Sequence, residues 1–305
     1  MSERPGSVLI VGSIALDTVE TPSDRRERIL GGAATFASVA ASLYAPVSIV
    51  GVVGRDFPVS YVGMLQARGI DTDGLEIRDG KTFFWEGVYG ADPNDRTTVT
   101  TELNVFGSFE PKLPEAYRSC EYVFLANIDP DLQLSVLDQV KNPKFVCVDT
   151  MNFWIEGKPD VLVQVLKRVD MALLNDSEAR MLGGASSLVE CARNITEMGP
   201  KYLTIKKGEH GAMLLDDDGW FMCPPCLVEH VTDPTGAGDT FAGALIGSVA
   251  AEGGTDHRRL RKAVMRGTAA ASYAIGDFSL DGLFPVTRED VEDRVEELAR
   301  MMACT

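Results

Sequence analysis

Short apolar runs alternate along this chain with longer segments in which apolar and polar residues are mixed. Such runs are typical of buried strands, which we expect at residues 7–12, 47–54, 122–126 and 145–148. The mixed segments predict helices at 61–68, 132–140, 160–168, 258–274 and 290–302, and the polar stretches 22–28 and 69–75 are predicted as loops. This alternation predicts an α/β fold of three layers, in which a mostly parallel central sheet carries helices on both faces.

One segment departs from this alternation of strand and helix patterns and predicts a β-hairpin. Aromatic and β-branched residues at 82–89 and 97–103 flank a turn-rich centre. Phe83, Trp85 and Tyr89 occupy alternating positions, so they share one face of their strand. They pack there either against a substrate or in the core of the hairpin.

A hairpin inserted into an α/β chain is a candidate lid, because its closure would exclude water from a reaction. The chain has 305 residues, 45% of them hydrophobic, which is enough for a large buried core. We expect one domain over residues 1–305, with a small β-sheet lid drawn from about 13–30 and 82–103. The polar face of the hairpin is also a candidate surface for a homodimer.

Net charge and apolar run length exclude two classes of protein. The formal net charge is −16, the reverse of what nucleic-acid-binding proteins normally carry. No apolar run approaches the ~20 residues of a membrane span. The six cysteines are scattered and no leader-like segment is visible. We therefore expect a cytoplasmic protein that binds neither nucleic acid nor membrane.

Candidate chemistry is concentrated in Asp-Pro-Thr-Gly-Ala-Gly-Asp, residues 233–239, at the start of a predicted helix. Small residues at Gly236, Ala237 and Gly238 let backbone N–H groups approach an anion, and a helix N-terminus adds about half a positive charge. Asp239 adds a carboxylate, so the turn has the parts for phosphoryl transfer to an alcohol. The alternative interpretation is an ordinary glycine-rich helix start capped by Asp, which would have the same composition and no anion site. The chain has no G-x-x-x-x-G-K-[ST] sequence, and the turn lacks the third glycine of a dinucleotide fingerprint.

Residues 233–243 resemble the C-terminal signature of the ribokinase-like (PfkB) carbohydrate and nucleoside kinases, and 11–17 and 171–179 resemble two further family segments. The resemblance implies a kinase that uses ATP and Mg²⁺, with Asp239 as the general base and the Gly236–Gly238 turn as the anion hole. It also aligns 269–277 with the family's adenine and monovalent-cation region. A monovalent cation is therefore a candidate further ligand.

The same resemblance implies the residues that bind the acceptor. Asp17 corresponds to a carboxylate that accepts hydrogen bonds from substrate hydroxyls, and Gly31 and Gly32 let the backbone approach the acceptor. As local patterns, Asp17 is a turn residue and the glycines begin a helix that packs closely on the sheet. Phe36 stands where most members carry an asparagine, so we expect it to form a wall of the acceptor site. Asn152 is a further candidate just beyond a strand.

Nucleotide-binding candidates follow two later strands. Asn175 and Glu178 match the family's Asn-x-x-Glu, whose glutamate organises Mg²⁺, an ion that prefers oxygen ligands and keeps several waters. As a local pattern, the same pair caps a helix. Lys206, Gly208 and Gly211 align with the nucleotide-binding segment. Lys206 either offsets phosphate charge there or lies solvated at the strand end.

The functional hypothesis is an ATP-dependent kinase that transfers the γ-phosphoryl group to a hydroxyl of a small sugar or polyol. A nucleoside is the alternative acceptor, because Phe36, Phe83 and Trp85 offer stacking faces for a base. The alternative from another class is a non-catalytic ligand-binding sensor on the same fold. Asp239 argues against that sensor, because binding alone needs no base.

Overall fold

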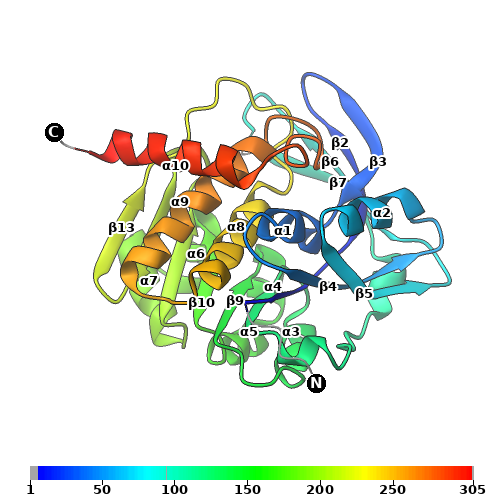
Figure 1. Cartoon of the computed structure of the whole chain (residues 1–305), viewed down its shortest axis with the longest axis horizontal. Coiled ribbons are helices and arrows are strands. Elements are labelled where there is room, and N and C mark those ends of the chain that lie inside the picture. Colours follow the sequence, from blue (N-terminus) through cyan, green and yellow to red (C-terminus); the bar gives the residue numbers. More distant parts are fainter. Residues whose placement is uncertain (1–5, 94, 304–305) are drawn as a thin grey trace.

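The central sheet lies at the core of the computed structural model, which describes residues 6–93 and 95–303 (Figure 1). Its strands are β1 (Val8–Val11), β4 (Val47–Gly54), β5 (Ile70–Arg78), β8 (Tyr122–Leu125), β9 (Phe145–Asp149), β10 (Met171–Asn175), β11 (Tyr202–Lys206), β12 (Ala212–Asp216) and β13 (Gly219–Cys223). Their order is β13-β12-β11-β10-β9-β8-β1-β4-β5. Neighbours from β11 to β5 are parallel, and β12 and β13 form an antiparallel hairpin at one edge.

Helices cover both faces of this sheet because side chains alternate between the faces along each buried strand. In β1, Val8 and Ile10 join one apolar core, whereas Leu9 and Val11 join the other. The first core includes α1 (Ala33–Ala41), α2 (Val59–Ala67), α8 (Ala237–Glu252), α9 (His257–Ala274) and α10 (Arg288–Met302). The second includes α3 (Pro130–Leu137), α4 (Asn152–Gly157), α5 (Pro159–Leu166), α6 (Asp176–Gly183) and α7 (Leu188–Glu197). The predicted three-layer α/β fold is confirmed.

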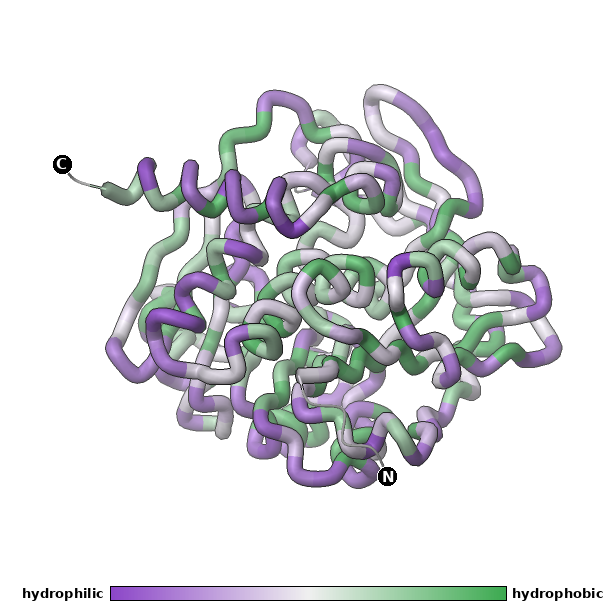
Figure 2. Tube along the Cα trace, in the orientation of Figure 1, coloured by the Kyte–Doolittle hydropathy of each residue, from purple (hydrophilic) through white to green (hydrophobic). Residues whose placement is uncertain are grey.

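Hydropathy follows these layers. The central strands are green in Figure 2, and α10 on the outside is mostly purple. Helix α1 is buried along its whole length, where it packs against α8 and the sheet. No helix in the described residues combines the length and the apolar character needed to cross a bilayer.

A second, four-stranded sheet forms the lid. It consists of β2 (Ala15–Glu20), β3 (Arg25–Gly31), β6 (Phe83–Tyr89) and β7 (Arg96–Glu102), in the order β3-β2-β6-β7. Strand β2 pairs in parallel with β6 and antiparallel with β3. The predicted small β-sheet lid is thus confirmed, and both of its predicted chain segments contribute to it.

Two predicted loops are wrong, because each contains part of an edge strand. Residues 25–28 belong to β3, whose polar side chains pair across the lid surface, as in the 2.8 Å contact between Arg25 and Glu86. Residues 70–75 belong to β5 at the edge of the central sheet. An edge strand is partly exposed, so its polar residues hide the strand pattern in the sequence.

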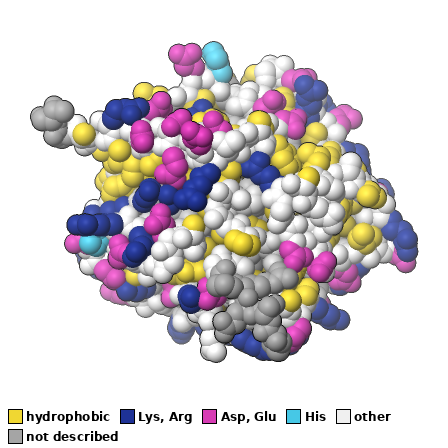
Figure 3. All heavy atoms as spheres, viewed as in Figure 1, with side chains coloured by type: hydrophobic (Ala, Val, Ile, Leu, Met, Phe, Trp, Pro, Cys, Tyr) yellow, Lys and Arg dark blue, Asp and Glu magenta, His cyan; other side chains and the backbone are white. Residues whose placement is uncertain are grey.

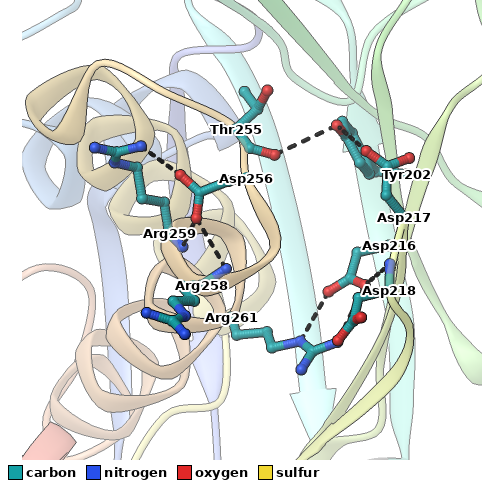
Figure 4. Close-up of polar contacts among 9 residues, drawn as sticks. All are labelled: Tyr202, Asp216, Asp217, Asp218, Thr255, Asp256, Arg258, Arg259 and Arg261. Atoms are coloured by element: carbon teal, nitrogen blue, oxygen red, sulfur yellow. Dashed lines mark hydrogen bonds and ion pairs between the residues drawn. The ribbon is translucent and has the colours of Figure 1, made fainter.

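Polar contacts join the β11–β13 edge of the central sheet to α9 and to the residues just before it (Figure 4). Arg261 donates to Asp216 and Asp218 of the β12–β13 hairpin, each at 2.9 Å. The hydroxyl of Tyr202, the first residue of β11, donates to the carbonyl of Thr255 at 3.3 Å. Only the Tyr202 contact touches β11, at the end of the strand opposite Lys206.

Candidate active site

Gly236 forms the turn that leads into α8. Its φ of 75° lies in the left-handed region that favours glycine, and a Cβ there would lie 2.5 Å from the ring of Phe36. Phe36 is 1% exposed, so α1 supports the turn through a buried ring. The first backbone bond of the helix joins Thr240 N to Gly236 O at 2.8 Å. The N–H groups of Gly238 and Asp239 precede that bond and have no helical acceptor, so they are available to an anion.

Asp233 ties this turn to more distant parts of the chain. Its buried carboxylate accepts hydrogen bonds from Thr235 N at 2.9 Å and from Ser279 N at 3.0 Å. Ser279, in the loop after α9, also donates its hydroxyl to the carbonyl of Leu30 in the lid. The turn, the loop and the lid are therefore joined by a few buried contacts.

Two carboxylates with strongly raised pKa values lie beside the turn. Burial, followed by the negative charge of Asp149, raises the pKa of Asp239 to about 7. Burial, followed by the charges of Asp233 and Asp239, raises the pKa of Asp17 to about 8. A carboxylate with a pKa near 7 is well matched to general-base work at neutral pH.

Gly31 and Gly32 both contact the Asp17 carboxylate. A Cβ at Gly31 would overlap Oδ2 of Asp17, and the N–H of Gly32 donates to the same carboxylate. Gly32 is the residue before α1 and has a φ of 95°. The two glycines therefore place the carboxylate and the start of α1 side by side.

Lys206 and Asp149 form an ion pair across the end of β10. Lys206 Nζ lies 2.5 Å from Asp149 Oδ2, and the two side chains are 16% and 6% exposed. A Cβ at Gly238 would lie 3.2 Å from this Nζ, so the ammonium is next to the anion-binding turn. Burial opposes its charge, but Asp149 and Glu178 outweigh burial and raise the pKa of Lys206.

Asn175 and Glu178 form a capping box at the start of α6. Asn175 Oδ1 accepts from Glu178 N at 2.8 Å, and Glu178 Oε2 accepts from Asn175 N at 2.7 Å. Burial and then the charge of Asp149 raise the pKa of Glu178 to about 7. The described residues contain no group of three or more His, Cys, Asp or Glu side chains placed to hold a metal by themselves. One carboxylate still suits Mg²⁺, which takes its other ligands from waters and phosphate oxygens.

In the part of the chain that the structure describes, the remaining predicted residues make no hydrogen bond or ion pair with the residues above. Asn152 is exposed at the first position of α4, three residues beyond Asp149. Gly208 is the first residue of the 3₁₀ turn η3 (Gly208–His210), which connects β11 to β12, and Gly211 directly follows this turn. Both lie close in sequence to Lys206 at the end of β11.

The family model for the pfkB family carbohydrate kinases matches residues 7–285. The chain belongs to the PfkB family. It is therefore an ATP-binding phosphotransferase that acts on an alcohol group, and the family predicted from residues 233–243 is confirmed.

Relatives of this PfkB protein include nucleoside kinases. It is 31% identical over 245 residues to the cytidine kinase of Thermococcus kodakarensis, which covers 78% of this chain and 87% of the relative. The Burkholderia thailandensis nucleoside kinase, solved in complex with inosine, superposes with a TM-score of 0.79 at 21% identity, over 95% of this chain and 96% of that one. A ribokinase-type protein from E. coli, solved with ATP and Mg²⁺, has a TM-score of 0.79 at 20% identity and covers 95% and 99% of the two chains.

The lid of this PfkB protein brings residues to the site that the sequence analysis missed. Arg96 lies over the Trp85 ring, 5.3 Å from its centroid. Its positive charge opposes the burial that raises the pKa values of Asp17, Asp239 and Glu178. Thr235 Oγ1 donates to the hydroxyl of Tyr89 at 3.1 Å. The sequence signal for Arg96 was slight, a single basic residue at the start of the second hairpin strand.

Proposed function

We propose that this PfkB protein transfers the γ-phosphoryl group of ATP to a hydroxyl of a nucleoside. The observation that carries the choice of acceptor is the 31% identity to a cytidine kinase over most of both chains. The fold shared with an inosine-bound nucleoside kinase agrees with this choice. A nucleoside is thus favoured over the sugar or polyol that the sequence analysis put first.

In this proposal, Asp17 accepts hydrogen bonds from acceptor hydroxyls, beside the backbone at Gly31 and Gly32. Trp85 pairs in register with Asp17 across β2 and β6, so an aromatic residue borders the carboxylate that would bind a ribose. Phe36 was predicted as a wall of the acceptor site, but it is 1% exposed and its ring packs against Gly236, so we assign it a supporting role through the turn. Asn152 forms part of the rim of the acceptor site.

Asp239 is the general base. It takes the proton of the acceptor hydroxyl, whose oxygen forms a bond to the γ-phosphorus while the bond from that phosphorus to the β-phosphate oxygen breaks and ADP leaves. The Gly236–Gly238 turn is the anion hole, in which the N–H groups of Gly238 and Asp239 stabilise charge on the transferring group, whereas the N–H of Ala237 donates to the carbonyl of Pro234 at 3.3 Å. The pKa of about 7 means that Asp239 is substantially ionised at neutral pH yet basic enough to accept the proton.

The nucleotide lies on the opposite side of the turn in this proposal. Asn175, Lys206, Gly208 and Gly211 border its phosphates. Glu178 is the protein ligand of Mg²⁺, directly or through water, and the ion supplies charge neutralisation on the phosphates when bound. A monovalent cation and a homodimer formed through the lid remain predictions of the sequence.

A panel assay tests this function. ADP release is measured with Mg²⁺-ATP and single nucleosides, sugars or polyols, for the wild type and for Asp239→Asn. We expect turnover with at least one nucleoside, and a loss of about 10²–10⁴-fold in kcat for the variant with ATP binding retained. Turnover with a sugar or polyol alone would reject the nucleoside acceptor. A protein that binds ATP and nucleosides without turnover would instead support the ligand-binding sensor.

A further inference from the structure

Lys206 does not point into solvent, as a lysine at the end of a strand ordinarily does. Lys206 is in register with Asn175 on β10, whereas Asp149 lies at the end of β9, on the far side of β10. The side chain therefore crosses the end of an intervening strand to reach its 2.5 Å partner. This path brings the ammonium in front of the cap formed by Asn175 and Glu178.

Asp149 is itself held in place. Its Oδ1 accepts from Thr150 N at 2.8 Å, which leaves Oδ2 to face Lys206. Its carbonyl oxygen accepts from Gln133 Nε2 at 3.1 Å, and the same fully buried amide group donates to the carbonyl of Ala126 at 3.0 Å. A carboxylate fixed at side chain and backbone gives the lysine one preferred position.

That position is next to the turn whose N–H groups are available to an anion. The ammonium is adjacent to Gly238 in the anion-binding turn, and its charge also acts on Glu178 and Asp239. In the proposed reaction, Gly238 belongs to the anion-binding turn, Glu178 is the ligand of Mg²⁺ and Asp239 is the base. A cation shared by all three lies between the nucleotide and the acceptor.

We propose that Asp149 is a positioning residue that holds Lys206 beside Gly238, where Lys206 binds the γ-phosphoryl group and neutralises its charge during transfer. The inference rests on the proposed function for the transfer step. Binding of the γ-phosphoryl group needs only that the nucleotide occupies the site. Neither residue takes a proton from the acceptor, which stays the role of Asp239.

The test compares affinities for Mg²⁺-AMP-PNP and Mg²⁺-ADP by calorimetry, because only the first nucleotide carries a γ-phosphoryl group. Lys206→Met should weaken AMP-PNP binding about 10- to 100-fold and ADP binding several-fold less, as expected for the loss of one charge-assisted hydrogen bond. Lys206→Arg should recover part of this difference. The matched control is Lys201→Met, at the opposite end of β11, where Lys201 pairs with Asp217 on the surface. It should leave both affinities unchanged.

A double-mutant cycle tests the role of Asp149. If Asp149 acts through Lys206, Asp149→Asn weakens AMP-PNP binding, but adding it to Lys206→Met causes no further loss. The double variant also removes both buried charges, so it stays measurable if Lys206→Met alone leaves Asp149 unpaired and unfolds the protein. In the wild type and Lys206→Arg, kcat should follow the AMP-PNP affinity, whereas KM for the acceptor should stay constant.

Three results would overturn the inference. Equal losses of ADP and AMP-PNP affinity in the lysine variant would show that Lys206 does not discriminate the γ-phosphoryl group. Additive effects in the double variant would give Asp149 a role of its own. If the wild type binds AMP-PNP no more tightly than ADP, the site makes no favourable contact with the γ-phosphoryl group, and the inference fails. A wild type that discriminates the two nucleotides but phosphorylates no acceptor would reject the proposed function and leave the γ-phosphoryl site supported.

Discussion

At the scale of single residues, burial and neighbouring charges define the chemistry of the site. Asp239, the proposed base, illustrates this, because burial and then the charge of Asp149 raise the pKa of its carboxyl to about 7. Lys206 and Arg96 lower that pKa and keep part of the population ionised. The balance of these groups predicts how activity depends on pH.

The first prediction concerns this pH dependence. The base works when deprotonated, and its pKa is raised, so kcat/KM should fall as pH drops below about 7 and level off above it. Asp149→Asn removes the neighbouring negative charge and should move the midpoint to lower pH. The measurement is a steady-state profile from pH 5 to 9. A profile that stays flat through pH 6–8, or a midpoint that rises in Asp149→Asn, would contradict the role of Asp239.

The second prediction concerns the space around Asp17. An alanine at Gly31 would force the buried carboxylate out of place, because its Cβ would overlap Oδ2. Gly31→Ala should raise KM for the acceptor at least about 10-fold, as expected when a hydrogen bond to a charged group is lost, with ATP affinity unchanged. Gly63→Ala is the control, since a Cβ on that helical glycine meets nothing within 4 Å. Equal KM values for the two variants would mean that Asp17 does not bind the acceptor.

Some residues of the candidate site could be predicted from the sequence and others could not. Local order was enough to single out Asp239 and the capping pair Asn175 and Glu178, because the turn before α8 and the cap of α6 are each formed by residues close in the chain. Arg96 and Asp149 were not singled out as site residues. Their contacts depend on how the lid folds over the site and on a side chain that crosses β10, and neither leaves a pattern in a single sequence.

At the scale of elements, the lid and the turn before α8 are directly connected. Tyr89 packs with Val19 and Phe278 in a small apolar cluster, and its hydroxyl accepts from Thr235 in the turn. The sequence predicted the lid segments correctly but missed β3, because a polar edge strand resembles a loop. The connection between lid and turn could not be predicted, since it joins residues 146 positions apart.

The third prediction tests this connection. Tyr89→Phe keeps the apolar ring and removes only the hydrogen bond to Thr235. Loss of that bond should favour lid opening, which lowers kcat/KM for the acceptor by about 3- to 10-fold and raises ADP release without acceptor. Tyr202→Phe is the control, because its hydroxyl bonds Thr255 and Asp217 at the far edge of the sheet (Figure 4). An unchanged ratio of ADP release with and without acceptor would show that the bond does not hold the lid.

At the scale of the whole molecule, charged side chains are distributed over the surface and also form clusters in the interior of the described residues. Figure 3 shows acidic and basic side chains interspersed over the face that α9 and α10 cover. Inside, one buried cluster is the site around Lys206, and another surrounds Arg266. Arg266 donates to Ser248 at 2.8 Å, to Glu252 at 2.9 Å and to Glu292 at 2.6 Å, and so joins α8, α9 and α10.

The fourth prediction separates stability from catalysis. Arg266→Met leaves Glu252 and Glu292 without their buried partner, and should lower the free energy of unfolding by about 3 kcal/mol. Chemical denaturation should still show one cooperative transition, in accord with the predicted single domain, and kcat of the folded variant should change little. Arg300→Met is the control, because that side chain is 67% exposed and 3.9 Å from Glu296. Equal stability of the two variants would contradict a structural role for Arg266.

The central claim is that Asp239 drives phosphoryl transfer to a nucleoside. It is tested most directly by ³¹P NMR of the protein with Mg²⁺-ATP and cytidine, beside the Asp239→Asn variant. The account predicts that the γ-phosphate signal is replaced by a phosphomonoester on the nucleoside with one ADP formed for each, and that the variant binds both ligands without forming the ester. Ester formation by the variant at the wild-type rate, or none by a wild type that binds both ligands, would contradict it.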